Sequence, residues 1–239
     1  MKNRWLWVAL LLAAAVIAMP YSTPLFAHFF PDLERPVYTQ EPFAWLLWQH
    51  CLLVGGSSLF SVVVASAVGI WVTRPSGQQF KTVVETLIST GQAFPPVAVL
   101  ALAVPLVGFG EVPALIALAI YGLLPVLQAS VGGLQGVPTS QRQAALGLGM
   151  STSQCLRYIE IPQALPVWLS GVRTSVIINI GTAAIASTVG AKTLGSPIIV
   201  GLSGFNTAYV LQGAILVALL AVTVDMAFER LARRVAFQA

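Results

Sequence analysis

Six apolar blocks constrain the fold of this chain more than any other feature of its sequence. Each block is long enough for one membrane span, because about 20 apolar residues cross about 30 Å of hydrocarbon as a helix. With 57% hydrophobic and 8% charged residues, the chain is also far less charged than soluble domains, which average roughly 25%. We therefore predict an all-α integral membrane protein with about six transmembrane helices. The blocks lie at about residues 5–24, 45–72, 84–107, 112–132, 167–189 and 208–228.

The first apolar block allows two interpretations. It follows Lys2 and Arg4, as the core of a cleaved signal peptide would. We favour a retained span, because the apolar character continues from Tyr21 to Phe30 and no clean small-x-small cleavage site precedes a soluble domain. Residues 1–44 are thus expected to form an N-terminal span and an outer connector, and residues 45–239 the main transmembrane domain.

The distribution of basic residues predicts the orientation of the spans. Positively charged residues accumulate in the cytoplasmic loops of membrane proteins. Placing both termini in the cytoplasm puts nine of the twelve basic residues on the inner side and leaves Arg35 and Lys192 outside. The inner set is Lys2, Arg4, Arg74, Lys81, Arg142, Arg157, Arg230, Arg233 and Arg234.

A polar segment at residues 134–166 separates the fourth and fifth blocks, on the predicted cytoplasmic side. Ser140 with Gln143, and Ser151 with Gln154, have the Ser-x-x-Gln spacing of a capping box, in which the two side chains satisfy free backbone N–H groups at a helix start. We expect two short helices to begin at these serines.

Other residues of this segment predict where those helices end and which small side chains lie on their surface. Gly149 is placed to end the first helix in the left-handed conformation, and Pro162 to end the second because it lacks an N–H. Helices this short are marginal in isolation, so a partner surface should hold them. Ala144, Ala145 and Gly149 are small enough to let such a surface approach closely.

Polar and helix-breaking residues also occur inside the spans. Gln92, Pro95, Pro96 and Pro125 predict bent helices, whose freed carbonyls need partners from neighbouring protein or from a water-lined cavity. A kinked packing helix and a helix lining a pathway are both open. The fifth block carries three polar residues that are candidates for a pathway or for hydrogen bonds between helices. These are Asn179, Ser187 and Thr188.

The sequence lacks the signatures of most enzymes. It has no nucleotide-binding phosphate loop, no metal-ligand spacing and only two histidines, so we expect no catalytic residue, no metal site and no cofactor. His50 and Ser57 lie about 10–12 Å apart along one helix, too far for a nucleophile and its base. Cys51 and Cys155 fall on opposite sides of the predicted membrane, which excludes a disulfide between them. In a membrane protein, the net charge of +4 does not indicate nucleic acid.

The 134–166 segment also resembles a known motif. Gln143-Ala144-Ala145 is followed after three residues by Gly149, and after nine more by Ile159-Glu160-Ile161-Pro162. This spacing is similar to that of the Glu-Ala-Ala loop in permease subunits of bacterial ABC importers. The resemblance implies the type I importer permease fold and a cytoplasmic coupling helix that docks on the ATPase. It assigns coupling to Gln143, Ala144, Ala145, Gly149, Ile161 and Pro162, with Gln143 in place of the usual glutamate.

Further motifs, between about Trp45 and Glu229, resemble the osmoprotectant branch of that family. They include Gln92-Ala-Phe-Pro-Pro, Gly171-Val-Arg-Thr and the run Gly190 to Gly195. The run keeps the ends of the branch's glycine-rich motif but has Lys192 in its middle, and a lysine there would repel a quaternary ammonium.

The resemblance implies an inner-membrane permease subunit that imports glycine betaine, choline or carnitine. Its expected partners are ATPase subunits, a second permease subunit that is identical or similar, an extracytoplasmic solute-binding protein and membrane lipid, with no nucleic acid. The alternatives are a permease for another small solute, such as an amino acid or a sulfonate, and a channel that needs no ATPase.

Overall fold

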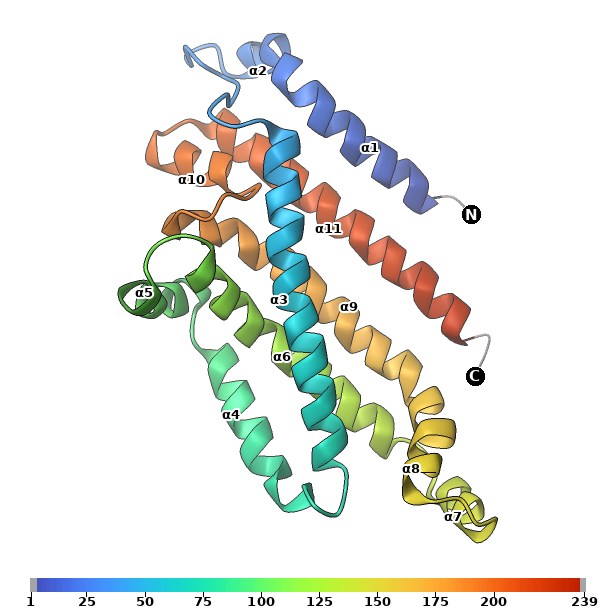
Figure 1. Cartoon of the computed structure of the whole chain (residues 1–239). Helices are drawn as coiled ribbons and strands as arrows, with labels where there is room; N and C mark the ends of the chain where they lie inside the picture. The colour runs from blue at the N-terminus through green and yellow to red at the C-terminus, as the bar shows by residue number, and fades with distance from the viewer. Residues whose placement is uncertain (1–3, 237–239) are drawn as a thin grey trace. The chain divides into compact units, whose positions relative to one another are not determined.

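The computed structural model describes residues 4–236, and all regular elements in this part of the chain are helical (Figure 1). The long helices are α1 (Arg4–Ala18), α3 (Phe43–Val72), α6 (Glu111–Gln135), α9 (Ile161–Ile185) and α11 (Thr207–Ala236). The shorter helices are α2 (Thr23–Phe29), α4 (Lys81–Ala93), α5 (Pro96–Val107), α7 (Thr139–Gly147), α8 (Thr152–Cys155) and α10 (Ser196–Ser203).

The predicted spans are present as helices. Within the described residues, five continuous helical stretches are long and apolar enough to cross a membrane, and α4 with α5 passes the same test as a broken sixth. The break falls at Phe94 and Pro95, where the paired prolines predicted a bend. The prediction of about six spans is therefore confirmed, while Lys2 of the predicted inner set lies outside the described residues. The five continuous stretches are Arg4–Tyr21, Phe43–Val72, Glu111–Gln135, Thr152–Val189 and Thr207–Arg234.

Contacts divide the chain into two units, each assembled from segments far apart in sequence. The first unit contains the chain up to Ser57 together with Phe94–Leu118 and Ile177–Ala227. The second contains Ser58–Ala93, Ala119–Val176 and the chain from Phe228. The helices α3, α6, α9 and α11 contribute residues to both units.

The core of the second unit is formed by α3, α6 and α9. Its buried centre consists of alanine, valine and leucine side chains that pack between the helices. Polar side chains inside this unit bond across the helices: Trp168 donates its Nε1–H to Ser66 Oγ at 2.7 Å, and Ser175 donates to the carbonyl of Gly122 at 2.9 Å. The buried centre is Ala65, Val72, Val126, Leu127, Val131 and Val172.

The proline of α6 is accommodated by a side chain from another helix. Pro125 lies inside α6 and has no N–H to donate to the carbonyl of Tyr121, four residues earlier. The side-chain amide of Gln92, on α4, donates to that carbonyl. The freed carbonyl is therefore satisfied by neighbouring protein, so for Gln92 and Pro125 the structure supports the packing interpretation of this bend.

The first unit holds the connector between α2 and α3 against the start of α11. Gln212 is fully buried, and its side-chain amide donates to the carbonyl of Pro36 at 2.6 Å and accepts from the N–H of Tyr38 at 3.0 Å. Asn206 donates to the carbonyl of Arg35 at 2.9 Å. The backbone of the predicted outer connector thus finds hydrogen-bond partners on side chains of and just before α11.

Candidate functional site

The first helix of the 134–166 segment is α7, and it begins earlier than predicted. Its N-cap is Pro138, without a side-chain cap, and Thr139 is its first residue. The predicted capping box of Ser140 and Gln143 is wrong, because Pro138 occupies the N-cap position and Ser140 is already the second residue of the helix. Gln143 has no capping role and is exposed.

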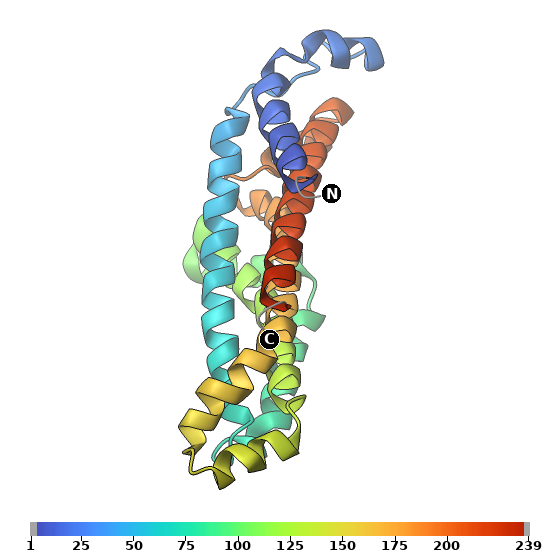
Figure 2. The same cartoon turned by 90° about the vertical axis from the view of Figure 1, so that its right-hand side faces the viewer.

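The end of α7 matches the prediction for Gly149. Its φ of 89° is the left-handed conformation that glycine adopts readily. Its N–H donates to the carbonyl of Leu146 at 3.0 Å, and the N–H of Met150 donates to that of Ala145 at 3.1 Å, which together form a Schellman motif. The turn directs the chain back toward α8, so that α7 and α8 lie together beyond the end of α6 (Figures 1 and 2).

The structure sorts the predicted coupling residues of α7 by exposure. Gln143, Ala144 and Gly149 are exposed, whereas Ala145 is 4% exposed and faces the protein. Leu148 is 84% exposed at the end of the same helix, although no motif singled it out. The outer face of α7 therefore combines small residues with two large apolar side chains, Leu148 and the 46% exposed Leu146, a combination suited to contact with another protein.

The second predicted helix begins as expected but does not stop at Pro162. Ser151 and Gln154 form a complete capping box, in which Ser151 Oγ accepts from the N–H of Gln154 at 3.2 Å. After α8 the chain continues through a π-helical turn, Leu156–Glu160, directly into α9. The predicted stop at Pro162 is wrong, because Pro162 sits at the start of α9, immediately after the π turn. In that wider turn the backbone pairs differently from an α-helix, so the missing N–H does not end the helix. Ile161 and Pro162 are both exposed.

A buried ion cluster that no sequence pattern predicted lies next to these helices. The side chain of Glu160 is 5% exposed and pairs through Oε2 with Arg74, which follows the end of α3. Its Oε1 lies 3.2 Å from Nε of Arg142, on α7. Arg142 also donates to the carbonyl of Leu134, in the last turn of α6. All four residues belong to the second unit.

An apolar cavity of about 240 Å³ lies in the same unit, between α3, α6 and α9. One of its walls is Trp168, whose indole N–H is already bonded to Ser66. The cavity therefore offers apolar surface and few free hydrogen-bonding groups. Its lining residues are Ser66, Ile70, Ser130, Leu134, Ile161, Ala164, Leu165 and Trp168.

The three candidate pathway residues have different surroundings in the first unit. Asn179 is fully buried. Ser187 is half-buried and lies 2.9 Å from Thr193 Oγ1 and 3.3 Å from Ser196 Oγ. Thr188 is exposed, in the short helical turn that follows α9, and donates to the carbonyl of Ile185, the last residue of α9, at 2.8 Å. The structure thus does not bring the three together, and only Thr188 presents a surface.

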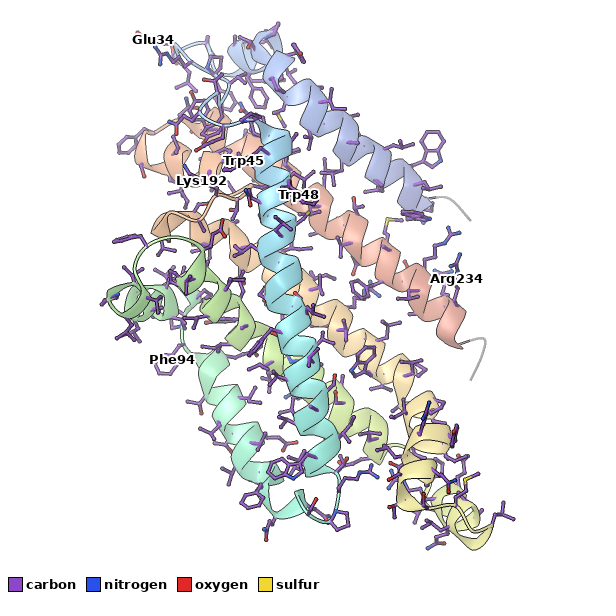
Figure 3. The ribbon with its side chains drawn as sticks, viewed as in Figure 1. Glu34, Trp45, Trp48, Phe94, Lys192 and Arg234 are labelled. Atoms are coloured by element: carbon purple, nitrogen blue, oxygen red, sulfur yellow. The ribbon has the colours of Figure 1, made fainter. Side chains whose placement is uncertain are left out.

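The charge of Lys192 is balanced by a carboxylate. Its Nζ lies 2.5 Å from Oε1 of Glu41, and Tyr38 donates to the other carboxylate oxygen. Burial is the largest single influence on Glu41 and opposes its ionisation. The hydrogen bonds from Lys192 and Tyr38, with the Lys192 charge, nevertheless hold the pKa of Glu41 below its usual value. Figure 3 shows Lys192 in the loop before α10, and Trp45 and Trp48 on the first turns of α3. From the sequence we expected Lys192 to repel a cation, but in the structure this lysine is paired with Glu41.

The remaining side chains that could serve in catalysis, a disulfide or metal binding have the following surroundings. Nε2 of His50 lies 3.1 Å from the carbonyl of Ile180, and its Nδ1 accepts from the N–H of Leu194 at 3.3 Å. Ser57 donates to a carbonyl of its own helix, so these two side chains do not pair. Cys51 and Cys155 are free thiols. Among residues 4–236, no three histidine, cysteine or acidic side chains gather as they would around a metal ion.

Comparison with known proteins gives concordant matches over most of the chain. Residues 65–237 match the sequence profile of the family described as "Binding-protein-dependent transport system inner membrane component". The chain is 37% identical to the osmoprotectant import permease protein OsmY of Salmonella typhimurium over 84% of its own length and 86% of that protein. It is 34% identical to the glycine betaine/carnitine/choline transport system permease protein OpuCB of Bacillus subtilis, over 75% and 86%.

Solved structures share the fold. A structure of the MetNI methionine ABC transporter in inward-facing conformations aligns with a TM-score of 0.71 and 23% identity, covering 82% of this chain and 99% of that one. An amino acid ABC transporter aligns with a TM-score of 0.64 and 21% identity, covering 82% and 93%. At these identities the likeness concerns the arrangement of the helices alone.

Proposed function

The chain belongs to the family of inner membrane components of binding-protein-dependent transport systems, and on this premise we propose that it imports a small osmoprotectant such as glycine betaine, choline or carnitine. Two sequence relatives at 37% and 34% identity carry these solutes or their class in their names. The similarity covers at least three quarters of the chain and 86% of each relative. The fold is that of type I ABC importer permeases.

The pairing of Lys192 with Glu41 removes one objection to a cationic solute. A free lysine would repel a quaternary ammonium, but this lysine has a carboxylate at 2.5 Å. The local charge is close to neutral, so a solute that carries a trimethylammonium group meets little repulsion there. The methionine and amino acid transporters share only the fold with this chain and do not argue for their solutes.

The proposed partners follow from what the chain lacks and from what α7 presents. The sequence has no phosphate-binding loop, so ATP hydrolysis would belong to separate subunits. Leu148 and the exposed small residues of α7 form the proposed docking surface for those ATPase subunits. A second permease subunit, a solute-binding protein and lipid complete the assembly.

The excess of basic residues around α7 favours a cytoplasmic position for this helix and for both termini. Residues 1–44 would add one span and a connector to the transmembrane domain at 45–239.

The solute is tested by uptake into proteoliposomes that contain this permease, its ATPase subunits and its binding protein. We expect ATP-dependent uptake of labelled glycine betaine, competed by choline or carnitine. Competition only by an amino acid or a sulfonate would identify another small-solute importer. Uptake that proceeds without the ATPase subunits would identify a channel and contradict the proposal.

The docking surface is tested by Leu148→Glu and Gly149→Arg. Leu148→Glu removes little internal packing, because the side chain is 84% exposed, but it places a charge where an apolar contact is proposed. We expect both variants to lose solute-stimulated ATP hydrolysis and copurification with the ATPase. Ser76→Glu, which adds the same charge at an exposed turn residue, is the matched control. Undiminished stimulation in Leu148→Glu would exclude this surface as the docking site.

A further inference from the structure

The backbone alone connects α7 weakly to the rest of the second unit. The helix has nine residues, and helices of this length are marginal in isolation. Gly136 lies in the connection that precedes it, and Gly149 in the connection that follows. Glycine permits many backbone conformations, so either connection could absorb a displacement of α7. Motion of α7 reaches the spans efficiently only if side chains fix it to them.

The Glu160 cluster supplies such a connection. Each oxygen of its carboxylate faces a different arginine: Oε2 faces Arg74 and Oε1 faces Arg142. Arg142 also donates to the carbonyl of Leu134, one of the last four carbonyls of α6, which have no partner within their own helix. The cluster therefore ties α7 to residues at the ends of α3 and α6 and at the start of α9. A carboxylate that is 5% exposed depends on such partners, because a buried unpaired charge is strongly unfavourable.

The π-helical turn before α9 directs Glu160 into this position. Cys155 and Glu160 are five residues apart, and both are buried. In an α-helix such residues would point about 140° apart, whereas the i→i+5 bonding of a π turn places them on the same side. The irregular turn thus gives Glu160 a buried orientation next to Arg142.

We propose that Arg74, Arg142 and Glu160 form an ionic clasp that makes α7 move as one body with the ends of α3, α6 and α9, so that displacement of α7 by the ATPase reorients the spans. The inference rests on the proposed function of α7 and assigns a positioning role to three residues that do not touch the solute. A second contact supports the same linkage, since Gln163 on α9 donates to Gln141 on α7 at 2.5 Å.

The test compares variants in the reconstituted complex of permease, ATPase subunits and binding protein. Glu160→Gln keeps the size of the side chain and removes its charge. Arg142→Gln breaks one arm and leaves Arg74 to pair the buried carboxylate, so this variant keeps its fold. Arg142→Lys keeps the charge. For each variant we measure glycine betaine imported per ATP hydrolysed, and the amount of assembled complex.

We expect Glu160→Gln and Arg142→Gln to import at least tenfold less solute per ATP, with assembled complex within twofold of wild type. Arg142→Lys should retain most of the wild-type ratio. Glu85→Gln, which breaks the exposed pair of Glu85 with Lys81, is the matched control and should equal wild type. A wild-type ratio in Arg142→Gln, or a loss of assembled complex with an unchanged ratio, would overturn the clasp as a coupling device.

A solute-independent readout separates this proposal from that of the substrate. In a Cys51→Ser background, Thr188→Cys places a thiol at an exposed position of the short helical turn that follows α9. ATP binding should change its labelling by a membrane-impermeant maleimide in the intact complex. Arg142→Gln should abolish that change. If the otherwise wild-type reporter imports no glycine betaine and still shows ATP-dependent labelling, the substrate proposal fails. In that case the labelling result alone tests the clasp. The clasp is overturned if Arg142→Gln labels as wild type does.

Discussion

Replacing Gly171 by alanine tests whether close contact of α6 and α9 stabilises the second unit. A Cβ at position 171 would lie 2.2 Å from the Cβ of Ala129 and 2.6 Å from the carbonyl oxygen of Pro125, whereas ordinary contacts begin at 3.4 Å. The two helices must therefore separate by about 1 Å, because neither obstacle can rotate away. Overpacking of this kind lowers the free energy of unfolding by about 1–3 kcal/mol. The better helix propensity of alanine offsets about 1 kcal/mol of this loss.

The expected net loss for Gly171→Ala is therefore between about 0 and 2 kcal/mol, or up to several degrees in the melting temperature. The assay is thermal melting of the detergent-solubilised permease, followed by size-exclusion chromatography. Gly181→Ala is the matched control, since it lies on the same helix and its added Cβ meets nothing within 4 Å. That variant should melt at or above wild type. If Gly171→Ala melts as high as Gly181→Ala, the contact between α6 and α9 is not tight, and the packing explanation of this glycine is refuted.

Two smaller effects should be measurable in the same preparation. The pKa of Glu41 is lowered, so its pairing with Lys192 stabilises the fold above the ordinary carboxyl pKa and is lost as pH falls through the lowered value. The difference in stability between wild type and Glu41→Gln, followed as a difference in melting temperature, should therefore shrink between pH 6 and the acid range. It starts from under about 1 kcal/mol, because the lysine of the pair is half exposed to solvent. A constant difference would contradict this linkage. Ser151→Ala removes the cap of α8 and should raise hydrogen exchange over residues 152–160 by an amount that corresponds to about 1 kcal/mol. Ser153→Ala, exposed in the same helix, should not; equal exchange in both would exclude the cap as the cause.

The spans were predictable from sequence because their cause is local. An apolar stretch of about 20 residues must satisfy its backbone internally in lipid, and a helix does so without help from elsewhere in the chain. The break of the third span could be predicted for the same reason, since Pro95 and Pro96 alter the backbone at their own positions. These features needed no knowledge of which helices are neighbours.

The 134–166 segment shows where local patterns stop being sufficient. Gly149 and the box of Ser151 and Gln154 were predicted correctly, because each acts within one turn. Ser140 has the same spacing with Gln143, yet Pro138 starts the helix before it. Pro162 also fails to end its helix, because the preceding turn is π-helical. In both cases a neighbouring residue or turn overrides the pattern.

The ion cluster of Glu160 could not be found from sequence because its three members are separated by 68 and 18 positions along the chain, from Arg74 to Arg142 and from Arg142 to Glu160. Only the fold brings them together. One signal was available: Glu160 is an acidic residue between two isoleucines, a position that predicts burial and hence a need for a cation. The sequence does not say which arginine would provide it.

The polar residues inside the spans lead to a consistent interpretation of what this chain contributes to transport. Gln92 and Ser175 bond backbone carbonyls of α6, and Ser187 bonds other hydroxyls near α10. Each such side chain has a use within the protein, which lowers the number of groups available to face a passing solute. Of the candidate pathway residues, only Thr188 is exposed, and its hydroxyl donates to the carbonyl of Ile185 at the end of α9. These hydrogen bonds connect elements of the protein to one another. The engagement of these polar side chains within the protein is compatible with the proposed assembly, in which a separate solute-binding protein takes part.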